Sequence, residues 1–393
     1  MADSRLGYPG LALSTIWQQS RNLSAALVSG ITEGGPGNDS CAMNMLSPSL
    51  KFTTAREDVC GTVRSAEVKT FTGAQGHQPC PRRRTREPSS LVGDARPEVV
   101  NKISMSIPEV QVIDQAVNTV RYPLSEPTSA AWRTVVTRAQ HELRNFGCSV
   151  LPGFIRPFLH DALKAECEQI APLAHYDVEV VNAYNIATDT PLPDDHPGRV
   201  TMERGNAFVA RDRIPKGAII HQLYASQPFQ NFVASCFELP RVFQLADPLA
   251  GLCLNVIDPG LEHPWHFDTN EFTVSLLTQE PQAGGIFEYC PNIRSAQAEN
   301  FDAVRTVLAG SGGHLVRRLP LLPGDLQLFM GRYSLHRVTR VQGETARHSV
   351  IFAYSERPGV IGNPTRTRQL FGRVLPAHLA GARNSVRGDQ LLD

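Results

Sequence analysis

The sequence has no excess of either charge, no secretion signal and no long apolar run. Its 393 residues include 38 Lys and Arg and 38 Asp and Glu, so the formal net charge at pH 7 is zero. Without a global positive field, the chain offers little attraction to nucleic acid or anionic membranes. We interpret the basic run PRRRTR (81–86) as a solvated segment.

No apolar run reaches the roughly 18–20 residues of a membrane span, and MADSRLGYPG lacks the order of a signal peptide. We therefore expect a soluble, cytoplasmic protein without nucleic-acid or membrane partners, and the oligomeric state stays open.

The cysteines lack the spacing of a metal or disulfide motif. No CxxC pair occurs among the eight, which are scattered along the chain. Such scatter in a large chain is typical of reduced thiols rather than of a disulfide framework or a zinc site. Aromatic residues are also few, at 7%, which gives little support to a nucleic-acid demethylase with stacking aromatics.

The character of the sequence changes near residue 105. Residues 1–105 show no sustained helical or alternating pattern and are rich in Gly, Pro, Ser and Arg, so we expect a largely disordered extension. Apolar residues at helical spacing predict one helix within 127–147, ending at Gly147, and a second at 156–174. After residue 250, short apolar runs separated by Gly- and Pro-containing turns predict many strands. We expect an α+β domain over 106–365, with a β-sandwich or barrel core, and a tail over 366–393.

The segment HPWHFDTNEF (263–272) contains the first candidate metal ligands. If a strand ends here, His266 and Asp268 point to the same face because they are two residues apart. His336, in YSLHRV, is a candidate third ligand from a later strand. Two imidazoles and one carboxylate on one face of an octahedral ion leave three open positions, an arrangement diagnostic of non-haem Fe(II) oxygenases. A polar turn without metal is the alternative interpretation.

A second motif follows eleven residues after His336. In RHS, Arg347 and Ser349 lie on one face of a predicted strand. Arg347 is placed to bind a carboxylate bidentately, with Ser349 donating to the same group. This pair would hold the distal carboxylate of 2-oxoglutarate while its keto-acid end chelates iron and O2 fills the remaining position. Arg347 as a surface ion-pairing residue is the alternative.

The two motifs, with LNVIDPGLEHPWHFDTNEFTVSLLT and PGDLQLFMGRYSLHRVTRV around them, resemble the Fe(II)/2-oxoglutarate dioxygenases. Within that family they are most similar to the group that acts on free amino acids, which includes lysine halogenases and fungal aziridine-forming valine oxidases. The resemblance covers about 110–365. It implies a double-stranded β-helix (jelly-roll, cupin-like) core with flanking N-terminal helices, and Fe(2+), 2-oxoglutarate and O2 as cofactors. The halogenases carry Gly where this chain has Asp268, so we do not expect halogenation.

The resemblance also implies further site residues. Asn255 and Ser349 would contact 2-oxoglutarate, though both are equally acceptable as ordinary strand residues. His263 corresponds to a histidine beside the halogenase substrate, and Arg204 lies near the position of the arginine that binds the substrate carboxylate. A solvent-facing turn for His263 and a surface role for Arg204 are the alternatives.

Strand parity gives an expectation for the substrate. If Arg347 points inward, Ile351 and Ala353 do so as well. The matching halogenase positions are polar and hold the substrate amine, whereas a buried ammonium beside Ile and Ala would have no partner. We therefore expect a free aliphatic amino acid, oxidised at an unactivated C–H bond by hydroxylation or by ring closure such as an aziridine, in secondary metabolism. The alternatives are another small molecule or a protein residue as substrate, an inactive cupin-like binding module, and Ile351 and Ala353 as plain core.

Overall fold

The computed structural model describes residues 114–381, 389 and 391–392. The predicted extension over residues 1–105 lies outside this part of the chain, and its disorder stays a prediction. None of the helices found in the described residues combines the length and the apolar character that crossing a membrane requires.

The described residues form helices and short strands in the order expected from the sequence. The helices are α3 (Ala130–Phe146), α4 (His160–Ile170), α5 (Ile219–Ala225), α6 (Gln227–Cys236), α7 (Phe301–Leu308), α8 (Pro364–Phe371) and α9 (Pro376–Gly381). The early strands are β1 (Cys148–Leu151), β2 (Glu179–Asn182), β3 (Thr201–Arg204), β4 (Ala207–Val209), β5 (Phe243–Gln244), β6 (Leu252–Ile257), β7 (His263–His266) and β8 (Thr273–Gln279). The later strands are β9 (Ala283–Gly284), β10 (Phe287–Cys290), β11 (Arg317–Leu319), β12 (Leu326–Phe329), β13 (Leu335–Val338), β14 (Val341–Gln342), β15 (Arg347–Phe352) and β16 (Tyr354–Ser355).

Two antiparallel sheets make up the barrel. The six-stranded sheet has the order β1-β12-β8-β15-β6-β4, and the four-stranded sheet has the order β11-β10-β13-β7. Along the chain, β6 and β8 belong to the first sheet while β7 between them belongs to the second, and β12, β13 and β15 alternate in the same way. This alternation is the double-stranded β-helix, and the predicted fold class is confirmed.

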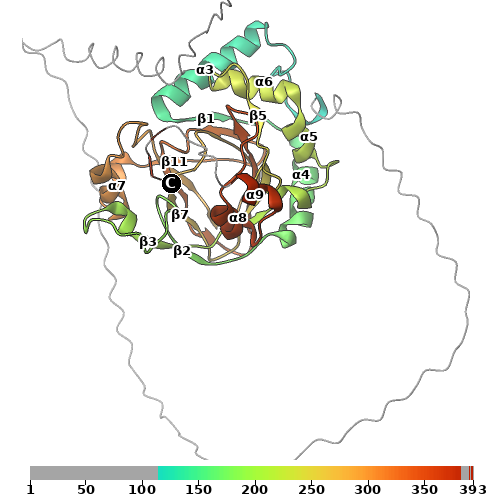
Figure 1. Cartoon of the computed structure of the whole chain (residues 1–393). Helices are drawn as coiled ribbons and strands as arrows, with labels where there is room; N and C mark the ends of the chain where they lie inside the picture. The colour runs from blue at the N-terminus through green and yellow to red at the C-terminus, as the bar shows by residue number, and fades with distance from the viewer. Residues whose placement is uncertain (1–113, 382–388, 390, 393) are drawn as a thin grey trace, which may run out of the picture. The chain divides into compact units, whose positions relative to one another are not determined.

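Strand parity separates the core from the interior of the barrel. On the six-stranded sheet, Val274, Leu328 and Val350 face outward and pack, fully buried, in the largest apolar cluster with residues of α3, α4 and α6. These helices lie along the outside of the barrel in Figure 1. The predicted first helix begins at its N-cap Ser129 and ends at Gly147, whose φ of 66° explains the glycine. The alternate residues of the same strands therefore face inward.

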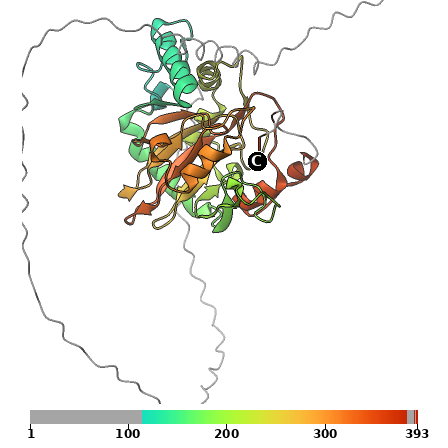
Figure 2. The same cartoon turned by 90° about the vertical axis from the view of Figure 1, so that its left-hand side faces the viewer.

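The C-terminal helices cover one end of the barrel. α8 and α9 lie in front of it in Figure 1 and to its right in Figure 2, so the two views agree. The predicted domain boundary at residue 365 falls inside α8, which packs against β4. Residues 366–381, which the sequence placed in a tail, thus include helices that cover the barrel.

Candidate active site

The three predicted ligands lie together at one end of paired strands. β7 and β13 are antiparallel neighbours in which His266 lies opposite His336. Asp268 follows β7, and its backbone N–H donates to the carbonyl of Gly331 at 3.1 Å. Its Oδ1 is 3.6 Å from Nε2 of His266 and 3.5 Å from Nε2 of His336. One donor atom from each of the three residues lies within 4.8 Å of the others, which is the geometry of a facial metal site.

The hydrogen bonds of the two histidines leave the correct nitrogen available for a metal. Nδ1 of His266 is 2.8 Å from the carbonyl of Pro264, and Nδ1 of His336 is 2.9 Å from that of Ser334. A carbonyl only accepts, so each Nδ1 carries a proton, and in the neutral imidazole each Nε2 then presents a lone pair. Burial, followed by the charge of His336, lowers the pKa of His266 to about 4. The neutral form, which is the one that binds metals, therefore dominates at neutral pH.

The carboxylate of Asp268 is held in place from its other side. Thr273 donates its hydroxyl proton to Oδ2 at 2.6 Å. Burial alone raises the pKa of Asp268, but His336 and His266 hold it well below its usual range. A Cβ at Gly331 would lie 1.9 Å from Oδ2, so only glycine leaves room for this carboxylate. Two neutral imidazole nitrogens and one carboxylate are the donor set that suits ferrous iron, and the site fits that ion.

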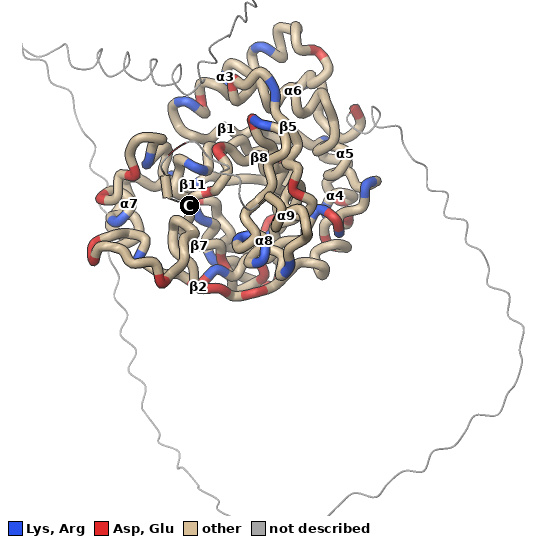
Figure 3. The backbone as a smooth tube through the Cα atoms, in the orientation of Figure 1, with Lys and Arg blue, Asp and Glu red and all other residues tan. Residues whose placement is uncertain are grey.

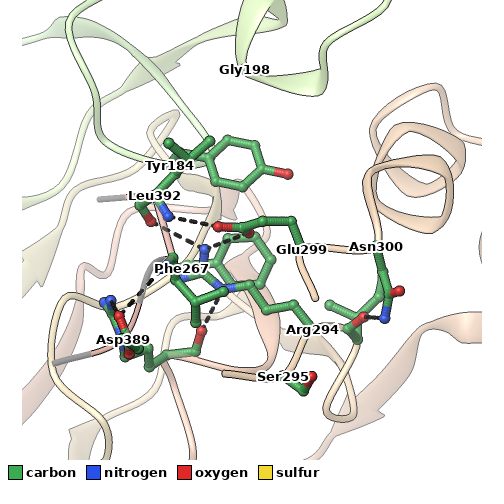
Figure 4. A network of polar contacts seen from close by, with 12 residues as sticks. Tyr184, Gly198, Phe267, Arg294, Ser295, Glu299, Asn300, Asp389 and Leu392 are labelled. Atoms are coloured by element: carbon green, nitrogen blue, oxygen red, sulfur yellow. Dashed lines mark hydrogen bonds and ion pairs between the residues drawn. The ribbon is translucent and has the colours of Figure 1, made fainter. Parts of the chain in front are cut away.

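Two buried arginines brace the loop that carries Asp268. Arg332 pairs with Asp389, from the C-terminal end of the chain, and donates to the carbonyl of Thr269 at 3.3 Å. The guanidinium of Arg294 lies 3.8 Å from the centroid of the Phe267 ring (Figure 4). Both arginines are fully buried, and Phe267 and Thr269 flank Asp268 on either side. The network therefore fixes the backbone on both sides of the carboxylate ligand.

A cavity of about 790 Å³ opens beside the three ligands. It is lined by the inward residues of β6, β8, β12 and β15 and by residues of α8. Nine of the ten predicted site residues line it. These nine are Asn255, His263, His266, Asp268, His336, Arg347, Ser349, Ile351 and Ala353. These nine positions, which were chosen from the sequence alone, therefore line one cavity, while their individual roles stay predictions.

The predicted cosubstrate residues form one polar wall of the cavity. Arg347 is buried, and its Nη1 donates to the hydroxyl of Ser349 at 3.1 Å. Within the described part of the chain, no carboxylate forms an ion pair with Arg347. Burial lowers the pKa of Arg347 to about 10, which leaves it charged at neutral pH. Asn255 lies opposite Ser349 on β6, and its Oδ1 accepts from Asn206 at 2.9 Å. A buried cation without a counter-ion is costly, and an anionic ligand would offset that cost.

The predicted substrate residues divide into two groups. His263 stacks on His266 with ring centroids 3.8 Å apart, so it lies beside the metal site rather than in a solvent-facing turn. Ile351 and Ala353 form an apolar stretch of the same wall as Arg347. Arg204 is different, because it does not line the cavity. Its Nη2 instead donates to Glu179 at 2.7 Å. Its Nε is buried without an acceptor, and binding of substrate by Arg204 stays a prediction that the ion pair does not favour.

Sequence reasoning missed one charged residue of the cavity. Arg366, on α8, lines the cavity with its neighbours Thr365 and Thr367. It lies beyond the last strand of the barrel, in a segment interpreted from sequence as a tail. The only available signal was the arginine-rich PTRTRQLF after Gly362-Asn363, whose spacing predicts a helix but does not indicate where it packs.

Comparisons with known proteins place the chain in a family. Residues 132–366 match the sequence profile of HalD, Halogenase D. No curated protein sequence matches the chain.

Among solved structures, an oxidoreductase of the 2OG-Fe(II) oxygenase family from Burkholderia pseudomallei shares 16% identity over 56% of this chain and 91% of its own, with a TM-score of 0.36. AviO1 from Streptomyces viridochromogenes Tue57 shares 18% identity over 57% of this chain and 96% of its own, with a TM-score of 0.39. The epimerase SnoN, in complex with Fe3+, alpha ketoglutarate and nogalamycin RO, shares 13% identity over 57% of this chain and 84% of its own, with a TM-score of 0.39.

The family assignment rests on the profile match and agrees with the geometry. The matched residues are more than half of the chain, and they include the HxD motif and the later histidine whose donor atoms converge. The alternation of strands between the two sheets gives the double-stranded β-helix that carries them. The chain therefore belongs to the Halogenase D family and is an iron(II)- and 2-oxoglutarate-dependent oxygenase.

Proposed function

We propose that this oxygenase oxidises an aliphatic C–H bond of a free amino acid of valine or isoleucine type, by hydroxylation or by C–N ring closure, and that it does not halogenate. The enzyme class and a small-molecule substrate follow from the family. Bound iron, with 2-oxoglutarate and O2 as cosubstrates, would supply oxidation of an unactivated C–H bond, with release of succinate and CO2. His266, Asp268 and His336 would hold the iron, and Arg347 with Ser349 and Asn255 the cosubstrate.

The observation that carries the substrate proposal is the apolar wall beside the metal site. Ile351 and Ala353 continue the inward face that begins with Arg347, and both line the cavity. An ammonium or guanidinium side chain held against this wall would lose its hydration without gaining a hydrogen-bond acceptor, which is costly. An aliphatic side chain loses no hydrogen bond to water there, and its burial against the wall is favourable. The wall therefore supports an aliphatic substrate and opposes a cationic one.

The protein contributes orientation and exclusion of water. The cavity is lined both by inward residues of the barrel and by residues of α8, so a bound amino acid would be held between the inner wall and the helix. Holding the reacting C–H bond near the metal in a fixed orientation lowers the barrier of the reaction. Hydroxylation and ring closure begin with the same C–H bond, so the position of the substrate amine decides between them.

Halogenation is opposed by the third protein ligand. An octahedral ion with two imidazoles and one carboxylate has three positions left. 2-Oxoglutarate and dioxygen would use these positions on a bound iron, so none would remain for a halide. Because Thr273 and Gly331 keep the Asp268 carboxylate in place, it is held ready to ligate.

A turnover panel tests the substrate proposal. Purified enzyme with iron(II) and 2-oxoglutarate would be given L-valine, L-isoleucine, L-leucine, L-lysine or L-arginine, with succinate and the products measured by mass spectrometry. We expect valine or isoleucine to raise succinate release at least about tenfold more than lysine or arginine, because a buried unpaired charge costs several kcal/mol. A clear preference for lysine or arginine would contradict the proposal.

A further inference from the structure

Arg366 is a cationic residue of the cavity with no assigned partner. It lies in the first turn of α8, outside both sheets, and lines the cavity opposite the barrel strands. Its Nη1 donates to Oε1 of Gln369 at 3.3 Å. Among the residues that the structure describes, no carboxylate forms an ion pair with it. A guanidinium that is partly removed from water and lacks a counter-ion is costly unless an anion joins it.

The neighbouring Arg204 differs because its charge is already balanced. Its Nη2 donates to Glu179 at 2.7 Å and to the backbone carbonyl of Gln369 at 3.2 Å. Arg204 therefore joins β3 to α8 and holds the helix over the cavity. Figure 3 shows basic positions on α8 and close to β7. Arg204 positions the helix, while Arg366 presents its charge to the cavity.

Asp247 anchors the other side of the segment that contains α8. It is fully buried, and its Oδ2 accepts from the backbone N–H of Gly362 at 2.8 Å. Its Oδ1 lies 3.2 Å from Nε2 of His378, on α9. The chain is thus fixed both before α8 and after it, so the position of Arg366 does not depend on a ligand. A charge that is preorganised in this way binds its partner with little ordering cost.

The charges of the cavity leave one cationic group without an anionic partner. 2-Oxoglutarate has two carboxylates, of which one would chelate iron with the keto oxygen and the other would meet Arg347. That leaves the cation at Arg366 free for another molecule. Burial, followed by the charge of Arg204, lowers the pKa of Arg366 to about 10, while the carboxylates of Glu179 and Asp268 act in the opposite direction, so Arg366 is charged at neutral pH. The lining of the same cavity includes Phe371 and Ile351, which suits an aliphatic body.

We propose that Arg366 binds the carboxylate of the substrate, so that the cavity has two separate carboxylate sites, one for 2-oxoglutarate at Arg347 and one for an aliphatic carboxylate at Arg366. This inference rests on the proposed function for the identity of the substrate. According to this proposal, α8 recognises the substrate carboxylate, and Arg204 on β3 does not. A charge-assisted contact of this kind is directional and discriminates against a neutral amide.

Anaerobic titration calorimetry of the iron(II)-loaded protein at saturating 2-oxoglutarate tests the second site. The probes are L-valine, L-valinamide and 3-methylbutanoate. We expect wild type to bind L-valine at least about tenfold more tightly than L-valinamide, the effect of losing one charged hydrogen bond. Arg366→Gln should weaken the binding of L-valine and of 3-methylbutanoate by about tenfold or more. It should also remove the preference for L-valine over L-valinamide. The affinity for 2-oxoglutarate should stay within about twofold of the wild-type value.

Matched variants separate the two arginines and the two proposals. Arg368→Gln, on the exposed face of α8, should bind every probe as wild type does. Arg347→Lys should weaken the binding of 2-oxoglutarate and leave the affinity for L-valine unchanged, because lysine cannot make the bidentate contact. If Arg366→Gln does not fold, Arg366→Lys takes its place and should show a smaller loss.

The outcomes distinguish failure of the inference from failure of the proposed function. Unchanged L-valine and 3-methylbutanoate affinity in Arg366→Gln overturns the inference, as does absence of any carboxylate binding by wild type beside 2-oxoglutarate. Weakened 2-oxoglutarate binding in Arg366→Gln also overturns it, since Arg366 would then serve the cosubstrate. If 3-methylbutanoate binds through Arg366 but no free amino acid is oxidised, the proposed substrate is wrong and the carboxylate site stands.

Discussion

His266→Ala, Asp268→Ala and His336→Ala are each expected to lose bound iron and to reduce iron-dependent succinate formation by more than about 100-fold. Loss of a residue that only orients a ligand costs 10- to 100-fold in metal affinity or activity, so loss of a ligand itself should cost more. The donor atoms of these residues converge from β7, the loop after it and β13. No other group of at least three His, Cys, Asp or Glu side chains in the described residues has metal-site geometry.

Metal analysis of the purified variants, together with succinate assays, measures this directly. His314→Ala is the control, because His314 is exposed and lies in the turn before β11. It should keep the iron content and turnover of wild type. Near wild-type iron and turnover in any one of the three ligand variants would show that the ligand assignment is wrong.

Gly331→Ala is expected to have nearly the same effect through a single methyl group. The new Cβ would lie 1.9 Å from Oδ2 of Asp268 and 2.9 Å from its Cβ, well inside van der Waals contact. The carboxylate can swing aside, so the fold should survive, but it then leaves both the metal position and the hydroxyl of Thr273. We expect iron affinity and turnover to fall by at least about 100-fold, with little change in the unfolding temperature of the metal-free protein.

Gly217→Ala is the matched control for that substitution. Gly217 is exposed, and a Cβ built on it meets no atom within 4 Å. Thermal unfolding of the two metal-free variants and iron titration of both would separate a metal effect from a folding effect. Wild-type iron binding by Gly331→Ala would mean that Asp268 does not ligate from the position seen in the structure.

The barrel and the convergence of its candidate ligands were predictable because they depend on local patterns. Alternation along the strand fixes that Arg347, Ser349 and Ile351 share a face, and the pairing of β7 with β13 needs only the HxD motif and a later histidine on a strand. The outward residues, such as Val274 and Val350, are apolar for the same reason. Period-two patterns give the side of a strand without any knowledge of the partner strand.

Contacts between distant polar residues were not predictable. The pairing of Arg332 with Asp389 and of Arg204 with Glu179 joins segments with no shared pattern. Arg366 looked like part of a tail because a basic helix after the last strand has no sequence feature that indicates where it packs. Such contacts are set by tertiary packing, which charge and periodicity do not encode.

The central claim is that this member of a halogenase family oxidises an amino acid without halogenating it. Mass spectrometry of the reaction with the best amino acid of the panel, run with and without added chloride or bromide, tests that claim most directly. The triad predicts a product that is one oxygen atom heavier or two hydrogen atoms lighter than the substrate, with succinate formation unaffected by halide. A halogenated product, or turnover that requires halide, would contradict it, because Asp268 would then have left the metal.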